Sequence, residues 1–146
     1  MPYRKFSSEI EIHRLGLGLI DRSLPKSEWT HAAHFAAALW LLRYRPKPDA
    51  ARCLPGFIRA YNEATGVANT ESGGYHETIT QASLRAARAV LAQHSPSTPV
   101  YEIANTLMAS PLGRSDWLLS YWSSPLLFSP EARMRWCDPD LQLFPW

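Results

Sequence analysis

The stretch AAHFAAALWLL, residues 32–42, decides the fold that this sequence predicts. It is apolar almost all round, and His34 is its only polar residue. Ser27, a good N-cap residue, precedes it and the helix-breaking Pro46 follows it, so we expect a helix over residues 28–43. A helix without a polar face is normally buried at the centre of a domain. The sequence therefore predicts that residues 32–42 form the central and most buried segment.

Helical patterns extend over most of the remaining chain. Residues 8–23 are ambiguous, because their apolar residues alternate as in a strand and Gly16 and Gly18 weaken a helix. A helical stripe of apolar residues and the N-cap candidate Ser8 favour a helix there. Further helices are predicted over residues 49–64, 75–94, 99–109 and 114–122, and from Ser129-Pro130 onward. The prediction is an all-α fold in which residues 1–146 form one domain, a bundle of five to seven helices with an up-down core of four.

Composition narrows the class of protein. The chain has 146 residues, of which 46% are hydrophobic and 19% charged, as expected for one globular domain. Its net charge is only +2 and its arginines are scattered, whereas a nucleic-acid-binding protein more often gathers them in a stripe. Residues 32–42 are too few to span a bilayer, which takes about 20 apolar residues. We therefore expect neither a nucleic-acid nor a membrane partner.

The predicted location is the cytoplasm. The N-terminal residues MPYRK lack the apolar stretch of a signal peptide. The two cysteines, Cys53 and Cys137, have no second Cys or His nearby at metal-binding spacing and do not form a disulfide framework. Both are expected to be reduced.

Two short segments carry most of the candidate chemistry: EWTHAAH at residues 28–34 and YHET at residues 75–78. Each segment opens a predicted helix. Consecutive helices in a bundle with short connections run antiparallel, so the second and fourth helices run the same way. Their first turns should therefore lie at the same end of the bundle, where the third helix brings Tyr61 and Asn62.

The first hypothesis is a metal site. His31 and His34 are neighbours on one helical face, and Glu28 precedes His31 by three residues, which is the Glu-x-x-His spacing of metal sites in helical bundles. His76 continues the core stripe of its own helix. With Glu28 or Glu77 completing the ligand set, these histidines would suit a divalent transition metal such as Zn, Fe, Mn or Ni. Hydrolytic or redox activity would follow from such a centre.

Two alternatives stand beside the metal hypothesis. One is a metal-free pocket for a small molecule or an anion, the latter bound by helix N-termini, Gly73-Gly74 and Lys26. The other is a structural or interaction protein in which the histidines are only packed or hydrogen-bonded, and in which Glu28 and Thr30 cap a helix. The residues expected to line the pocket are Lys26, Thr30, Tyr61, Asn62, Tyr75 and Thr78.

An aromatic stripe late in the chain raises the question of association. It comprises Trp117, Leu118, Tyr121 and Trp122, and the C-terminal segment adds Phe144 and Trp146. These residues either cover the core or leave an apolar patch exposed. An exposed patch would predict an interface, and a twofold homodimer is the commonest form.

Several segments together resemble a family of small uncharacterised bacterial proteins. They are LPKSEWTHAAH at 24–34, YN at 61–62, GYHETIT at 74–80, SPEAR at 129–133 and DPDL at 138–141. The resemblance covers most of the chain. It implies a helical protein and favours a helix over residues 8–23, but it implies no activity. CLPG at 53–56 departs from the family pattern and leaves the start of the third helix open.

Overall fold

The centre of the fold is helix α2 (His31–Tyr44). The computed structural model describes residues 4–146, and within it every residue from Phe35 to Leu41 is buried. Ala32 and Ala33 are buried as well, whereas His34 is exposed. The prediction of a central helix is confirmed. The helix is buried because an apolar segment without a polar face is stable only when neighbours cover it on all sides.

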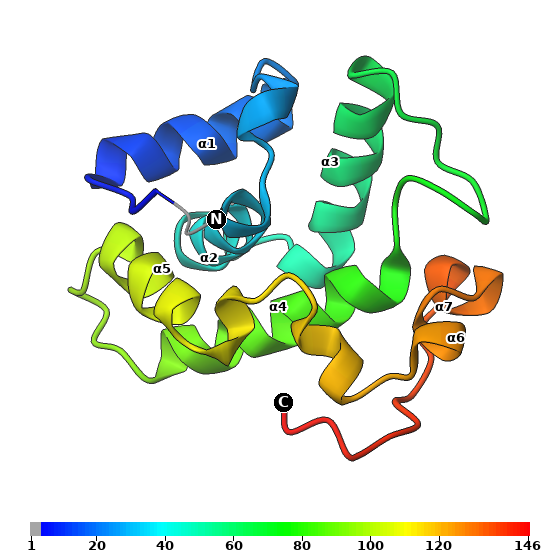
Figure 1. The fold of residues 1–146 in the computed structure, drawn as a ribbon. Coiled ribbons are helices and arrows are strands. Elements are labelled where there is room, and N and C mark those ends of the chain that lie inside the picture. Colours follow the sequence, from blue (N-terminus) through cyan, green and yellow to red (C-terminus); the bar gives the residue numbers. More distant parts are fainter. Residues whose placement is uncertain (1–3) are drawn as a thin grey trace.

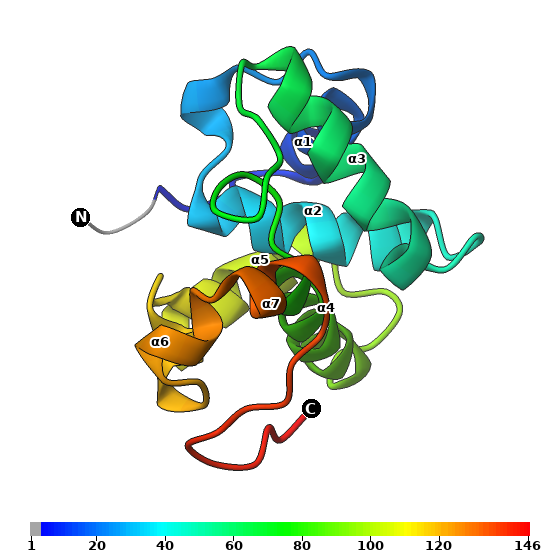
Figure 2. The same ribbon diagram turned by 90° about the vertical axis from the view of Figure 1, so that its right-hand side faces the viewer.

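Other helices cover α2 on two sides. Helices α1 (Glu9–Asp21) and α3 (Ala50–Ala64) lie on one side, and α4 (Glu77–Ala92) and α5 (Val100–Ala109) lie on the other (Figures 1 and 2). The shorter elements are η1 (Lys26–Glu28), η2 (Pro111–Gly113), η3 (Trp117–Ser120), α6 (Ser124–Leu127) and α7 (Pro130–Met134). Residues 4–146 thus form seven α-helices and no strand, so the all-α prediction is confirmed.

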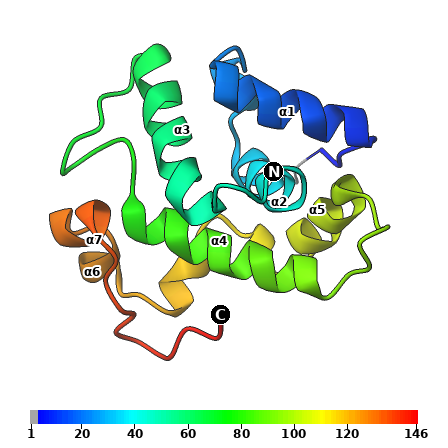
Figure 3. The same cartoon turned by 180° about the vertical axis from the view of Figure 1, so that it is seen from behind.

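The main helices cross one another at steep angles. In Figure 1, α2 is seen along its axis, α1 and α4 lie across the page, and α3 stands upright; Figure 3 shows the same crossings from behind. The up-down array expected of the four main helices is therefore not formed. Small residues allow the steep approach: a Cβ atom on Gly16 of α1 would lie 2.3 Å from the Trp40 ring of α2.

Of the three N-caps that the sequence predicted, Ser8 and Ser129 cap their helices and one does not. Ser8 caps α1 and accepts a hydrogen bond from Glu11 N at 3.3 Å, so residues 8–23 are helical as favoured. The exception is α2, which was expected to start after Ser27. Residues Lys26–Glu28 form a 3₁₀ turn instead, and Thr30 caps α2 by accepting from Ala33 N.

The predicted helix over residues 114–122 is wrong. The 3₁₀ turn η2 ends just before that region, the 3₁₀ turn η3 lies within it, and the short helix α6 follows it. By contrast, α7 begins at Pro130 after the N-cap Ser129, as expected. No helix of residues 4–146 combines the length and apolar character needed to cross a bilayer.

The late aromatic residues belong largely to the core. Trp117, Leu118 and Trp122 are buried, and the Phe144 ring lies 5.0 Å from the Trp122 ring between centroids. Most residues of the aromatic stripe therefore cover the core and do not form an exposed apolar patch. The homodimer stays a prediction.

Candidate functional site

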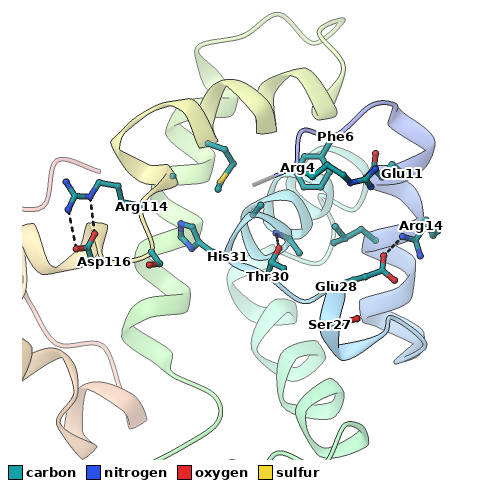
Figure 4. A pocket seen from close by; sticks show the side chains of 16 residues that line it. Arg4, Phe6, Glu11, Arg14, Ser27, Glu28, Thr30, His31, Arg114 and Asp116 are labelled. Atoms are coloured by element: carbon teal, nitrogen blue, oxygen red, sulfur yellow. Dashed lines mark hydrogen bonds and ion pairs between the residues drawn. The ribbon is translucent and has the colours of Figure 1, made fainter. Parts of the chain in front are cut away.

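A cleft of about 990 Å³ opens beside the first turn of α2. Its walls come from the segment before α1, α1 itself, the turn before α2, and the loop that follows α5 (Figure 4). The apolar part of the wall includes Phe6, Leu15, Ala32, Ala33 and Met108, and the polar part includes Ser27, Thr30, His31 and Ser115. This size and mixture are typical of small-molecule sites.

The charged residues of the cleft form three ion pairs. Arg4 contacts Glu11 at 2.8 Å, Arg14 contacts Glu28, and Arg114 contacts Asp116 at 3.2 Å (Figure 4). The three arginine side chains are 57–81% exposed. Each pair therefore contributes little to stability, roughly 0–1 kcal/mol, and can be exchanged at small cost for a contact with a ligand.

His31, together with Ser115 and Asp116, lies where the cleft meets a second cavity. Its side chain lines both the cleft and a neighbouring cavity of about 400 Å³. The Nε2 atom lies 2.9 Å from the carbonyl oxygen of Leu112, and because a carbonyl only accepts, Nε2 donates. The Nδ1 atom has no hydrogen-bond partner among residues 4–146 and is not a buried unpaired atom. It is therefore accessible to a ligand.

His34 lines the second cavity from the next position on the same helical face. Its Nδ1 atom donates to the carbonyl oxygen of Thr30 at 2.6 Å, and Trp29 stacks on its ring with 3.8 Å between centroids. His34 is exposed as a residue, but the surrounding protein desolvates its imidazole. This desolvation, with a smaller effect of His31, lowers the pKa of His34 to about 4, against the opposite effect of the Thr30 hydrogen bond. The imidazole is thus neutral at physiological pH.

His76 contributes to neither cavity, because the structure uses it as the N-cap of α4. Its Nδ1 atom accepts from Ile79 N at 3.2 Å and its Nε2 atom donates to the carbonyl oxygen of Leu127 at 2.6 Å. Both ring nitrogens are occupied and the side chain is buried. Its pKa is lowered, chiefly by desolvation and further by Arg133, although the bond to Leu127 acts in the opposite direction.

The neighbours of His76 hold the C-terminal segment in place. Thr78 is buried; its hydroxyl donates to the carbonyl oxygen of Arg135 at 2.9 Å and accepts from Cys137 N at 3.1 Å. Tyr75 is buried and donates to Glu77 at 2.5 Å. Of these residues predicted as pocket lining or metal ligands, the side chains of His76 and Thr78 anchor a chain segment about fifty to sixty residues away, whereas the Tyr75–Glu77 hydrogen bond is local. None of them lines the cleft or either of its two neighbouring cavities.

Three other predicted lining residues also lie outside these cavities. Tyr61 is buried and donates to the carbonyl oxygen of Leu24 at 2.8 Å. Asn62 donates to the side chain of Asn69 at 3.0 Å, which orders the loop before α4. Lys26 is exposed in η1, and neither Lys26 nor Gly73-Gly74, the parts of the expected anion cradle, lines one of the three cavities.

The five predicted metal ligands serve different partners. Glu28 lies before α2 rather than on its helical face, and it pairs with Arg14. Glu77 accepts from Tyr75, and His76 is occupied at both nitrogens. Within the described range 4–146, no three His, Cys, Asp or Glu side chains are grouped so that they could hold a metal ion. The arrangement of these side chains therefore gives the metal hypothesis no support.

The segment Arg114-Ser115-Asp116 was missed by the sequence analysis. Asp116 lines the cleft and both neighbouring cavities, and Arg114 lines two of the three. The only local signal was a run of polar residues after the turn residues Pro111 and Gly113. That signal marks a loop, but not which helix the loop approaches.

No family model matches this sequence, and comparisons with curated proteins and with solved structures returned no match. The resemblance to the bacterial family thus stays an expectation.

Proposed function

We propose that this protein binds a small zwitterionic organic molecule in the cleft beside His31, without a metal ion. The observation that carries the proposal is the position of His31 at the wall between two cavities, with an accessible Nδ1 atom. That nitrogen would accept a hydrogen bond from the ligand, while the bond from Nε2 to Leu112 fixes the ring.

The charges of the cleft favour a zwitterion over an anion. Arginine and carboxylate side chains alternate along the wall in three pairs, so both signs of charge lie within reach of one ligand. A phosphate or simple carboxylate would approach Glu11, Glu28 and Asp116 as closely as the arginines. A ligand that carries both an ammonium and a carboxylate can replace the partners of an exposed ion pair without leaving a charge unpaired.

The apolar part of the cleft wall indicates the chemistry of the ligand's uncharged part. Phe6, Leu15 and Met108 form a surface on which an uncharged side chain of the ligand can be buried. An α-amino acid with an apolar side chain carries the ammonium, the carboxylate and the apolar group together, and it is the probe that we would use first.

The test compares three forms of one probe by calorimetry on protein purified without a His-tag. Free leucine is zwitterionic, N-acetyl-leucine is anionic and leucinamide is cationic, and we expect the zwitterion to bind most tightly. His31→Gln keeps an amide donor for Leu112 but loses the Nδ1 acceptor, so it should weaken binding by up to about tenfold, as expected for one lost hydrogen bond. His94→Gln, which lies outside the three cavities, is the matched control.

Two results would overturn the proposal. One is that none of the free apolar amino acids binds, or that the anionic form binds as tightly as the zwitterion. The other is a stoichiometric metal in elemental analysis of the wild type that His31→Gln removes, which would favour the metal hypothesis instead.

A further inference from the structure

A third cavity, of about 570 Å³, lies on the other side of the loop that follows α5. It shares Arg114 and Asp116 with the cleft, but most of its wall is aromatic or aliphatic. Three aromatic side chains line it together with Val90, Pro111, Leu112 and Leu119. The three are Trp117, Tyr121 and Trp146, here called the aromatic corner.

The rings of the aromatic corner are inclined at 65–73° to one another. Phe144, which does not line this cavity, packs against all three with 5.3–6.1 Å between centroids. Trp117 and Tyr121 have 6.4 Å between centroids and an interplanar angle of 73°. The Trp146 ring lies 6.1 Å from each of the other two centroids, at 72° to Trp117 and 65° to Tyr121. No two of these rings are parallel, so they offer no slot in which a flat ligand could be sandwiched.

This geometry matches a rounded cationic group. A cation about 4.5 Å from each of three perpendicular ring faces requires ring centroids about 6.4 Å apart, and that distance is within the cation–π range of about 6 Å from each centroid. The observed separations of 6.1–6.4 Å agree with it. A quaternary ammonium is round, weakly hydrated and positive over its whole surface, and aromatic cages are the usual way in which proteins bind it.

Three aromatic rings elsewhere in the protein are each covered by an arginine side chain. Arg45 lies 5.4 Å from the Trp40 ring centroid, Arg59 lies 4.4 Å from Tyr75, and Arg85 lies 4.1 Å from Trp136. Among residues 4–146, no such cation covers a ring of the aromatic corner, although Arg114 lines the same cavity. Arg114 is held instead by Asp116.

We infer that the aromatic corner binds the trimethylammonium group of a small quaternary ammonium compound. The Arg114–Asp116 ion pair also lies in this cavity wall, so that the carboxylate of Asp116 is available at its edge. Gln93, Ser110 and Ser120 supply hydrogen-bonding groups for a short polar chain attached to the ammonium. The aromatic corner does not line the cleft beside His31, although the two cavities share Arg114 and Asp116.

The test uses choline and its neutral isostere 3,3-dimethyl-1-butanol, which differ only in the replacement of the nitrogen cation by carbon. Calorimetry on the full chain should show choline binding about tenfold more tightly than the alcohol, the difference expected when the cation–π attraction is lost. The indole N–H signals of Trp117 and Trp146 in an NMR spectrum should shift with choline.

Variants separate the cage from general packing. Trp146→Leu should weaken choline binding about tenfold and leave the alcohol almost unaffected, whereas Trp146→Phe should keep most of the choline affinity. Phe128→Leu, an exposed aromatic residue outside this cavity, is the matched control, and circular dichroism establishes that each variant is folded. Equal affinity for choline and the alcohol, no choline binding at millimolar concentration, or unchanged choline binding by Trp146→Leu would each overturn the inference.

Discussion

The imidazole of His76 and the carbonyl oxygen of Leu127 lie 2.6 Å apart and join the start of α4 to the end of α6. The same ring caps α4 through Ile79 N. One buried histidine thus fixes both a helix terminus and the path of a segment that lies 51 residues further along the chain. The role of His76 is therefore structural, whereas His31 and His34 line cavities.

Removal of this side chain should destabilise the fold. We expect His76→Ala to lower the free energy of unfolding by about 2–4 kcal/mol, because it loses a cap worth about 1 kcal/mol and leaves a buried carbonyl unpaired at a further cost of about 1–3 kcal/mol. Urea denaturation followed by circular dichroism measures the change. His76→Asn retains a capping side chain and should lose less; equal losses in the two variants would contradict the capping role.

Stability should also depend on pH through His76. The pKa of this group is lower in the folded state than the ordinary value of 6.5, so the unfolded chain binds the proton more readily. The stabilising contribution is therefore complete above about pH 6.5 and is lost as the pH falls towards the folded-state pKa. Denaturation curves between pH 7.5 and pH 5, values chosen to bracket the ordinary histidine pKa, should show a decline that is smaller in His76→Asn. An identical decline in both proteins would assign the effect to other groups.

Glu9 of α1 should be needed to cap α5. Its carboxylate accepts from Val100 N at 3.0 Å and from Tyr101 N at 2.9 Å, and α5 has no cap from its own N-cap residue, Pro99. Burial alone would raise the pKa of Glu9, but the hydrogen bonds from Tyr44 and from these two amides, together with His13, lower it overall. We expect Glu9→Gln to cost about 1 kcal/mol in thermal unfolding at pH 7 and less as the pH falls below 4.5 and then through the lowered folded-state pKa, where the wild-type carboxylate also becomes protonated. Glu71→Gln, an exposed loop change, should have no effect.

Two glycines on helices should respond in opposite ways to replacement by alanine. A Cβ atom at Gly16 would lie 2.3 Å from the Trp40 ring, whereas one at Gly56 would meet no atom within 4 Å. Gly16→Ala forces α1 away from α2 and should cost about 1–3 kcal/mol by overpacking. Gly56→Ala lies in an exposed helical position and should raise stability by roughly 0.5–1 kcal/mol. Similar effects at both positions would show that the close contact of α1 and α2 is not required.

A charge in the middle of α2 should unfold the protein or nearly so. Ala37 is 1% exposed and lies in the fully buried part of the helix. Ala37→Asp should cost several kcal/mol, about 3 or more, since the carboxylate has neither water nor a partner there. Ala68→Asp in an exposed loop is the control. Melting of the Ala37 variant close to that of the wild type would disprove the central position of α2.

The sequence alone was sufficient to predict most of the helices and the central position of α2, because these depend on local periodicity and capping. The apolar run of residues 32–42, the cap Ser8 and the Ser129-Pro130 start act over a few residues and have the expected effects in the structure. The choice of Thr30 over Ser27 as the cap of α2 was not local. Both are good caps, and the pairing of Glu28 with Arg14 in α1 accompanies the 3₁₀ turn that selects Thr30.

Only the tertiary structure decided which polar residues share a site. A histidine in a sequence motif can cap a helix, pack in the core or bind a ligand. Which of these it does depends on the residue from elsewhere in the chain that contacts its ring. Leu112, 81 residues away, orients His31 and leaves its Nδ1 atom accessible, while Leu127 occupies the remaining nitrogen of His76. These contacts depend on the steep crossing of the helices around α2, which small residues such as Gly16 allow. No periodicity along the chain encodes them.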